Sequence, residues 1–195
     1  MQEIILASQS PRRKQLLEWA EIPFRVHVRE TDESYPSGLL PEDVAIHIAR
    51  NKAIAASADI DPSHIILAAD TIVVIDGDII GKPRDRSEAI SILERLAGQT
   101  HKVITGVVLQ QGQREISFAD TTTVSFHPLT HDQVCFYVDN YKPYDKAGAY
   151  AIQEWIGVVG IRSVQGDFYN VMGLPVSRVY QAIMEMKDTP AEHKP

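Results

Sequence analysis

The chain has 195 residues, of which 44% are hydrophobic and 23% are charged, as in an ordinary globular protein. Its net charge of −7 argues against nucleic-acid binding, because proteins that bind phosphate backbones usually carry an excess of basic residues. A single cysteine excludes an internal disulfide framework, and no apolar stretch reaches the roughly 20 residues that a membrane span requires. The first residues lack the basic and apolar regions of a signal peptide, so we expect a cytoplasmic protein.

Apolar stretches with the spacing of strands and of helices alternate through the first half of the chain. Short strand segments are predicted at residues 3–7, 24–28, 65–69, 71–75 and 78–80. Asp76-Gly77 is typical of the two-residue turn of a hairpin. Ser10-Pro11 predicts the cap and the first residue of one helix, and a second helix is expected from Pro41 to about Ala58.

The second half of the chain is richer in strand patterns. Strands are predicted at residues 101–109, 115–126, 158–164 and 168–171. Asp85–Glu88 and Thr130–Gln133 resemble capping boxes, the first before a helix over 89–97 and the second before a helix that ends near Asn140. Leu174-Pro175 begins the last helix, and residues 188–195 are expected to form a flexible tail.

These elements predict an α/β fold in which helices flank a mixed, twisted sheet. We expect residues 1–187 to form one domain with two lobes around a central cleft. Cys135 lies in an apolar stretch and is expected to be a buried, inert thiol.

The stretch Ser8–Lys14 is the first candidate for a functional site. Small polar residues follow a predicted strand, and three cations stand in the first turn of the next helix, Arg12, Arg13 and Lys14. Positive charge is unfavourable at this end of a helix dipole, and a bound phosphate would compensate it. The alternative is a basic turn whose charges are solvated. The glycines of a Walker motif are missing.

Asp70 is the second candidate, because it interrupts an apolar run that extends from residue 65 to residue 75. A carboxylate in a buried strand carries a desolvation penalty unless it meets a cation, a metal ion or hydrogen-bond donors. Such a residue is a natural metal ligand or general base, although it can also cap a turn at the end of a strand. The acidic loop 30–33 either offers oxygen ligands to a hard cation such as Mg²⁺ or is a solvated run of charge.

Three further polar residues are candidates for a functional site. Lys52 shares a helix face with apolar residues three, four and seven positions earlier. Its side chain either snorkels at the edge of that face, which we favour, or reaches into a pocket. Lys82 precedes a proline that would make the local backbone rigid. Gln153 ends a run of small residues, where its amide could read a base edge or satisfy backbone groups.

An ordered set of motifs resembles the Maf (septum-formation inhibitor) family over about residues 4–183. The motifs are Ala7–Arg13, Ala69–Val73, Lys82–Asp85, Gly98–His101, Thr105–Val107, Asp145–Gln153 and Met172–Pro175. The resemblance implies a nucleoside triphosphate pyrophosphatase that releases a monophosphate and pyrophosphate, uses Mg²⁺ or Mn²⁺, and forms a homodimer. The stretch Lys146–Gln153 resembles the branch that acts on dTTP and UTP. Glu154-Trp155 follows Gln153 where that branch has Gln-Gly.

The resemblance also implies a role for each candidate residue. Asp70 would accept a proton, and the other catalytic residues would be Lys52, Lys82 and Glu33. The metal ligands would be Glu33 and Asp70. Substrate binding is expected from Ser8, Ser10, Arg12, Arg13, Thr71 and Gln153, of which Arg12, Thr71 and Gln153 match positions linked to the choice of nucleotide. Two alternatives stay open: a related house-cleaning triphosphatase that acts on 7-methyl-GTP or ITP, and a non-catalytic nucleotide-binding regulator of cell division.

Overall fold

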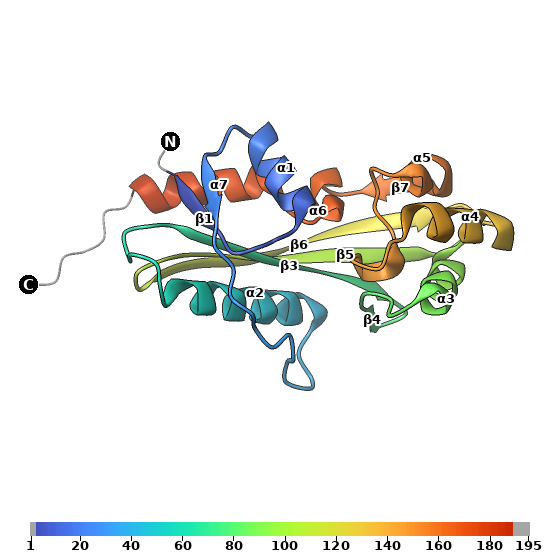
Figure 1. The fold of residues 1–195 in the computed structure, drawn as a ribbon, viewed down its shortest axis with the longest axis horizontal. Coiled ribbons are helices and arrows are strands. Elements are labelled where there is room, and N and C mark those ends of the chain that lie inside the picture. The colour runs from blue at the N-terminus through green and yellow to red at the C-terminus, as the bar shows by residue number, and fades with distance from the viewer. Residues whose placement is uncertain (1–2, 189–195) are drawn as a thin grey trace, which may run out of the picture. The chain divides into compact units, whose positions relative to one another are not determined.

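The computed structural model describes residues 3–188, and it shows helices packed against one mixed sheet (Figure 1). The strands of this part of the chain are β1 Ile4–Leu6, β2 Phe24–Val26, β3 Ile66–Ile75, β4 Asp78–Ile80, β5 Thr100–Gln111, β6 Arg114–Phe126 and β7 Ile161–Gln165. The helices are α1 Pro11–Trp19, α2 Pro41–Ser57, α3 Arg86–Leu96, α4 His131–Tyr141, the 3₁₀ turn η1 Ala147–Ala149, α5 Trp155–Gly160, α6 Phe168–Met172 and α7 Val176–Asp188. All but the first residue of the predicted flexible tail, 188–195, lies outside the described residues.

The sheet has the strand order β2-β1-β3-β5-β6-β7, and β4 pairs with β3. Strand β1 is parallel to both β2 and β3, whereas β4 is antiparallel to β3 and β7 is antiparallel to β6. The predicted α/β class with a mixed sheet and flanking helices is therefore confirmed. Within residues 3–188, no helix is both long and apolar enough to cross a lipid bilayer.

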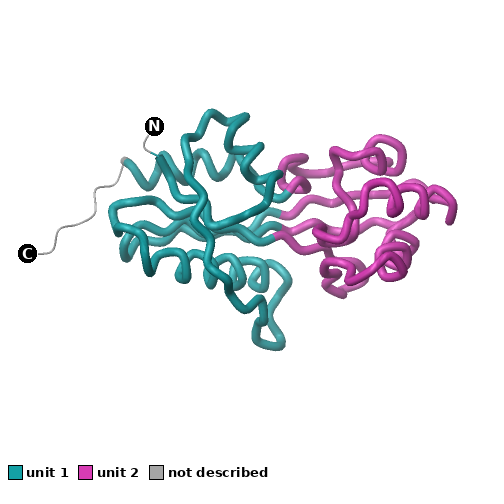
Figure 2. Tube along the Cα trace, in the orientation of Figure 1, with its two compact units in different colours: residues 1–70, 105–120, 173–195 teal, residues 71–104, 121–172 magenta. Residues whose placement is uncertain are grey.

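The chain divides into two compact units (Figure 2). Unit 1 combines the residues up to Asp70 with residues 105–120 and the chain from Gly173 onward. Unit 2 consists of Thr71–Ile104 and Thr121–Met172.

In unit 1, helix α2 packs closely on the sheet through small residues. Helix α2 lies along one side of the strands of this unit, and α1 and α7 lie along the other (Figure 1). The cluster beneath α2 joins three of its alanines to residues of β1, β3 and β5 and to Ala7, which follows β1: Ile5, Ala7, Ala49, Ala53, Ala56, Ile66, Ala68 and Val108. A Cβ atom added to Gly106 would lie 2.2 Å from the carbonyl carbon of Ala45. The backbone of α2 therefore rests almost directly on β5.

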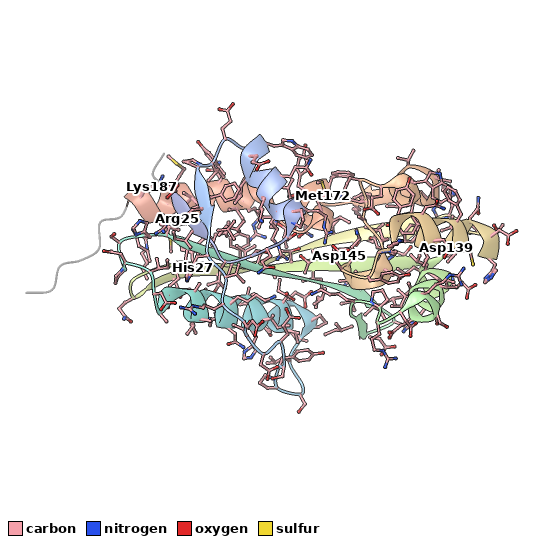
Figure 3. All side chains as sticks on the ribbon, in the orientation of Figure 1. Arg25, His27, Asp139, Asp145, Met172 and Lys187 are labelled. Atoms are coloured by element: carbon pink, nitrogen blue, oxygen red, sulfur yellow. The ribbon has the colours of Figure 1, made fainter. Side chains whose placement is uncertain are left out.

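In unit 2, three buried rings of the core pack against one another, one pair stacked and two pairs edge to face. The rings of His101, Phe126 and Tyr150 lie within 5.2–5.5 Å of one another, centroid to centroid. Helix α4 packs against α3 and carries Asp139 on its outer side, and Asp145 lies on the segment that follows (Figure 3). Cys135, also on α4, is half-buried, so its predicted full burial is wrong; the buried face of α4 consists of Val134, Tyr137 and Val138.

Local sequence signals are confirmed at several element boundaries. Ser10 caps α1 by accepting a hydrogen bond from the Arg13 amide at 3.5 Å, and Pro11 is its first residue. The β3–β4 hairpin has the predicted two-residue turn, since Ile75 pairs with Asp78. Thr130 and Gln133 form the complete capping box of α4.

Other predictions of local structure are wrong. Residues 168–171, predicted as a strand, lie in helix α6, because Asp167 caps the start of this segment by accepting a hydrogen bond from the Tyr169 amide at 2.8 Å. Within α6, the buried Asn170 amide donates to the Val103 carbonyl and the Thr122 hydroxyl. The strand predicted from residue 158 begins only at Ile161, because α5 extends to Gly160. Helix α3 begins at Arg86 rather than at residue 89, since Asp85 alone caps it.

Candidate active site

An ammonium group held by two carboxylates forms the centre of the site in unit 1. The Nζ atom of Lys52 lies 2.7 Å from Oδ1 of Asp70 and 2.8 Å from Oε1 of Glu33. The side chains of Lys52 and Asp70 are only 18% and 15% exposed, whereas that of Glu33 is 50% exposed. The ion pair between Lys52 and Asp70 is thus largely shielded from water, and Glu33 closes it on the solvent side.

The packing of α2 on the sheet explains why these two residues meet. Alternate residues of a strand point to the same face, so Asp70 continues the row formed by Ile66 and Ala68 beneath α2. Lys52 lies on α2 beside the alanines that cover that row. The snorkelling favoured for Lys52 from its helical pattern is therefore wrong: the lysine points toward a carboxylate that the sequence places 18 residues away.

The turn between β1 and α1 is built around the side chains of Ser8 and Arg13. Ser8 is 7% exposed, and its hydroxyl accepts hydrogen bonds from the Ser10 amide at 3.2 Å and from Nη1 of Arg13 at 3.1 Å. The Nε of Arg13 donates to the carbonyl of Gly173 at 2.8 Å. Arg13 therefore connects this turn to the segment that precedes α7, and Arg12, next to it, is half-buried.

The charge of Arg13 is buried near the carboxylates of the site. Burial lowers the pKa of the Arg13 guanidinium, the carboxylate of Asp70 raises it, neighbouring Arg12 lowers it, and Glu33 raises it. Electrostatic coupling of Arg13 to both Asp70 and Glu33 means that the β1–α1 turn lies beside the Lys52 ion pair. Unit 1 thus brings together seven of the residues expected in the site: Ser8, Ser10, Arg12, Arg13, Glu33, Lys52 and Asp70.

Three candidate residues, Thr71, Lys82 and Gln153, belong to unit 2. Thr71 follows Asp70 directly in β3 and is half-buried. Lys82 is exposed and precedes the buried Pro83, and the carbonyl of Gly81 accepts a hydrogen bond from the Gly148 amide at 3.1 Å. Gln153 is exposed, and the amide of Glu154 donates to the Ala151 carbonyl at 3.1 Å, so Gln153 occupies the third position of a four-residue turn.

Several residues that shape these segments carried no clear sequence signal. The buried hydroxyl of Tyr137 donates to Oε2 of Glu154 and accepts from the Ala151 amide at 3.2 Å. The ammonium of Lys146 lies 3.5 Å from the other carboxylate oxygen of Glu154. The sequence singled out Glu154 only as a departure from the family pattern, because its partners Tyr137 and Lys146 come from elements that no local motif connects.

Two carboxylates of unit 1 could supply oxygen ligands to a hard divalent cation. Glu33 and Asp70 converge on a single point, the ammonium of Lys52, and their carboxylate oxygens are the ligands that Mg²⁺ prefers. In the part of the chain that the structure describes, no group of three or more His, Cys, Asp or Glu residues is suitably placed to hold a metal ion. A cation here would need oxygen atoms from a substrate, as is usual for Mg²⁺ at phosphate-binding sites.

Two solved structures share the fold of this chain. A Ham1 protein from Coxiella burnetii has a similar fold, with a TM-score of 0.51 and 16% identity over 95% of this chain and all of the other. The Ham1 protein from Staphylococcus aureus gives the same TM-score with 15% identity and the same coverage. At such low identity these likenesses concern the fold alone.

Sequence comparison then identifies the family. The chain belongs to the Maf family, since the family model described as Maf-like protein matches residues 3–186. A relative from Cytophaga hutchinsonii, named dTTP/UTP pyrophosphatase, is 50% identical over 94% of this chain and 84% of its own length. Relatives of the same name from Porphyromonas gingivalis and Bacteroides fragilis are 45% and 44% identical, over 95% and 94% of this chain and 94% and 96% of theirs.

Proposed function

We propose that this protein is a nucleoside triphosphate pyrophosphatase that hydrolyses dTTP and UTP to the monophosphate and pyrophosphate. The observation that carries the proposal is the shielded Lys52–Asp70 pair beside the basic β1–α1 turn, in a chain whose relatives carry that name. The reaction is an attack of water on the α-phosphorus with pyrophosphate as the leaving group. It needs a base for the water and positive charge for the phosphates.

The β1–α1 turn is the proposed phosphate-binding element. Helix α1 starts at Pro11 with no acidic residue in its first turn, so its positive end is open to an anion. Arg13 is engaged by Ser8 and Gly173, and in this proposal it holds the shape of the turn. Arg12 is the better placed of the two to contact phosphate, since it is less buried, and the Ser8 and Ser10 region supplies the turn around it.

Asp70 is the proposed general base. Lys52 holds its carboxylate in place from the helix side, and the same ammonium can compensate charge that develops on the phosphate oxygens. Glu33 and Asp70 would hold a Mg²⁺ or Mn²⁺ ion together with substrate oxygens. When bound, that ion would neutralise phosphate charge and make the attacking water easier to deprotonate.

Residues of unit 2 are assigned to the rest of the nucleotide. Lys82, exposed after β4, is a candidate to compensate charge on the leaving pyrophosphate. Gln153 and Thr71 are the candidates for reading the base, because a side-chain amide offers one donor and one acceptor to the edge of uracil or thymine. A site built on such hydrogen bonds rejects other bases strongly, since a wrong base leaves buried polar groups unpaired.

A pyrophosphate-release assay over a nucleotide panel tests this function. The panel should contain dTTP, UTP, CTP, GTP, ITP and 7-methyl-GTP, each with Mg²⁺, with Mn²⁺ and with a chelator. We expect dTTP and UTP to be hydrolysed fastest and the chelator to stop the reaction. Preference for ITP or 7-methyl-GTP would instead favour the related house-cleaning enzymes, and binding without pyrophosphate release would favour a regulator. Cytoplasmic localisation, a homodimer and the absence of nucleic-acid binding stay predictions.

A further inference from the structure

The turn that presents Gln153 in unit 2 is closed at both ends by one hydroxyl group. The Tyr137 hydroxyl accepts a hydrogen bond from the Ala151 amide, the first residue of the turn, and donates one to the carboxylate of Glu154, the last. The turn also has its own backbone hydrogen bond from the Glu154 amide to the Ala151 carbonyl at 3.1 Å. Gln153 is therefore the exposed residue of a turn whose two ends are tied to the same point on α4.

The hydroxyl that closes the turn is itself held rigidly. Tyr137 is fully buried, and its ring stacks on that of Tyr141 with 5.0 Å between the centroids. A side chain packed in this way keeps one position, so the hydrogen bonds of its hydroxyl hold the turn in place. Trp155, the residue after Glu154, adds an edge-to-face contact with Phe136 of α4, with 4.9 Å between the ring centroids.

A buried charge supports the Glu154 end of the turn. The Lys146 side chain is 10% exposed, and its ammonium lies 2.7 Å from Oδ1 of Asp145 and 3.5 Å from Oε1 of Glu154. The ammonium thus draws the Glu154 carboxylate toward the start of the segment 145–153 while Tyr137 binds its other oxygen. A neutral glutamine at position 154 could still accept from Tyr137 but would lose the charge interaction with Lys146.

We propose that Tyr137 and Glu154 are positioning residues for base recognition: they act through Gln153 and do not touch the nucleotide. The inference rests on the proposed function, in which the Gln153 amide reads the pyrimidine edge. A glutamine on a loose turn could shift to meet the hydrogen-bonding groups of several bases. Discrimination therefore requires the amide to be held in place, and this clamp supplies that constraint.

The test compares Tyr137→Phe with Tyr141→Phe, which removes a hydroxyl from the neighbouring, partly exposed ring of the stacked pair. Pyrophosphate release from UTP, CTP and GTP gives kcat and KM for each. We expect Tyr137→Phe to lower the preference for UTP, measured as the ratio of kcat/KM values, by about threefold to tenfold, the usual effect of one or two hydrogen bonds. The change should come mainly from KM for UTP, and Tyr141→Phe should keep the wild-type ratio.

A second pair of variants keeps the test decisive if Tyr137→Phe does not fold. Glu154→Gln retains an acceptor for the Tyr137 hydroxyl, and Glu154→Ala does not. The inference expects the UTP preference to fall in Glu154→Ala and to be largely restored in Glu154→Gln. Equal base preference in all four variants and the wild type would overturn the clamp.

The control for the proposed function is Gln153→Ala. If the wild type hydrolyses UTP and Gln153→Ala loses base preference while the clamp variants keep it, only the clamp inference fails. If the wild type releases no pyrophosphate from dTTP or UTP, the proposed function itself fails.

Discussion

The ammonium of Lys52 lies 2.7 Å from a carboxylate oxygen of Asp70, and this ion pair connects helix α2 to strand β3. Among the ion-paired side chains of unit 1, these two are among the least exposed. The carboxylate of Glu33 contacts the same ammonium group. A shielded ion pair of this kind is weak evidence for stability, since desolvation offsets most of the attraction. It is stronger evidence for function, because shielded carboxylates beside cations are typical of sites that handle protons and phosphates.

Replacing Asp70 by asparagine is expected to remove catalysis while leaving the fold intact. The amide oxygen of the introduced asparagine can still accept from Lys52, but it cannot take a proton from water at neutral pH. We expect kcat for dTTP to fall on the order of 10²–10⁴-fold, as for the loss of a general base. The measurement is pyrophosphate release, with circular dichroism to monitor the fold.

Asp120 provides the matched control for this variant. Its side chain is 17% exposed and pairs with Arg178 at 2.9 Å, so Asp120→Asn also weakens the ion pair of a largely buried carboxylate in unit 1. That variant should retain turnover close to that of the wild type. If Asp70→Asn also retained it, Asp70 would not be the base.

Removing the charge of Lys52 is expected to lower both stability and substrate affinity. In Lys52→Met the carboxylates of Asp70 and Glu33 lose the ammonium that they share and repel each other. Because the pair remains partly accessible to water, we expect a loss of about 1–3 kcal/mol in the free energy of unfolding, less than for a fully buried pair. Urea denaturation measures this loss, and steady-state kinetics should show a higher KM for dTTP.

Lys102 is a suitable control, since it is an exposed lysine on β5. Lys102→Met should change neither the denaturation midpoint nor the KM. Wild-type stability in Lys52→Met would show that the pair with Asp70 contributes nothing to folding, and a wild-type KM would remove Lys52 from the substrate site.

How much could be predicted from sequence depended on whether the decisive contacts were local. The Ser10-Pro11 helix start, the hairpin turn 76–77 and the capping box Thr130–Gln133 each involve neighbours in the chain, and all three were predicted. Residues 155–160 and 168–172 are rich in apolar and β-branched or aromatic residues, yet both are helical. At Gly157, an added Cβ would lie 1.7 Å from the carbonyl oxygen of Ile152, a close approach that no periodicity reveals.

The same distinction holds for the site. The residue types at positions 52 and 70 marked them as unusual, because a charge stood in an apolar pattern at each. Their contact depends on the register of α2 on the sheet, and local spacing led to the wrong orientation for Lys52. The clamp between Tyr137 and Glu154 joins residues 17 apart through a buried hydroxyl, and only coordinates could show it.

Adding a methyl group at Gly106 is expected to separate α2 from the sheet. The new Cβ would lie 2.2–2.4 Å from backbone atoms of Ala45 and Ile46, which cannot move independently of the helix. We expect Gly106→Ala to lower the free energy of unfolding by about 1–3 kcal/mol and to reduce turnover, since α2 carries Lys52. Thermal unfolding and pyrophosphate release measure the two effects.

In Gly81→Ala, where a Cβ would meet no atom within 4 Å, thermal stability should be unchanged. Equal stability of both variants would mean that the helix does not rest on β5 as described.

The stability of the protein is expected to fall in mild acid because of His101. This imidazole is 2% exposed, and burial lowers its pKa from 6.5 to about 4. Between these values the unfolded chain binds a proton at His101 and the folded protein does not, so the unfolded state gains as the pH falls. The stabilisation is complete above about pH 6.5 and is lost progressively toward pH 4, by up to about 3 kcal/mol for a shift of this size.

Urea denaturation at a series of pH values between 7.5 and 4 tests this expectation with the variant His101→Gln. Glutamine can keep the hydrogen bond with the Tyr150 hydroxyl, which lies 2.7 Å from Nε2 of His101, but it does not titrate. The difference in unfolding free energy between the wild type and the variant should therefore shrink or change sign as the pH falls through 6.5 toward 4. His127→Gln serves as the control, because His127 is exposed and is not taken out of water on folding. If His101→Gln and the wild type lost stability in parallel over this range, the acid sensitivity would come from other groups, and protonation of His101 would not be its cause.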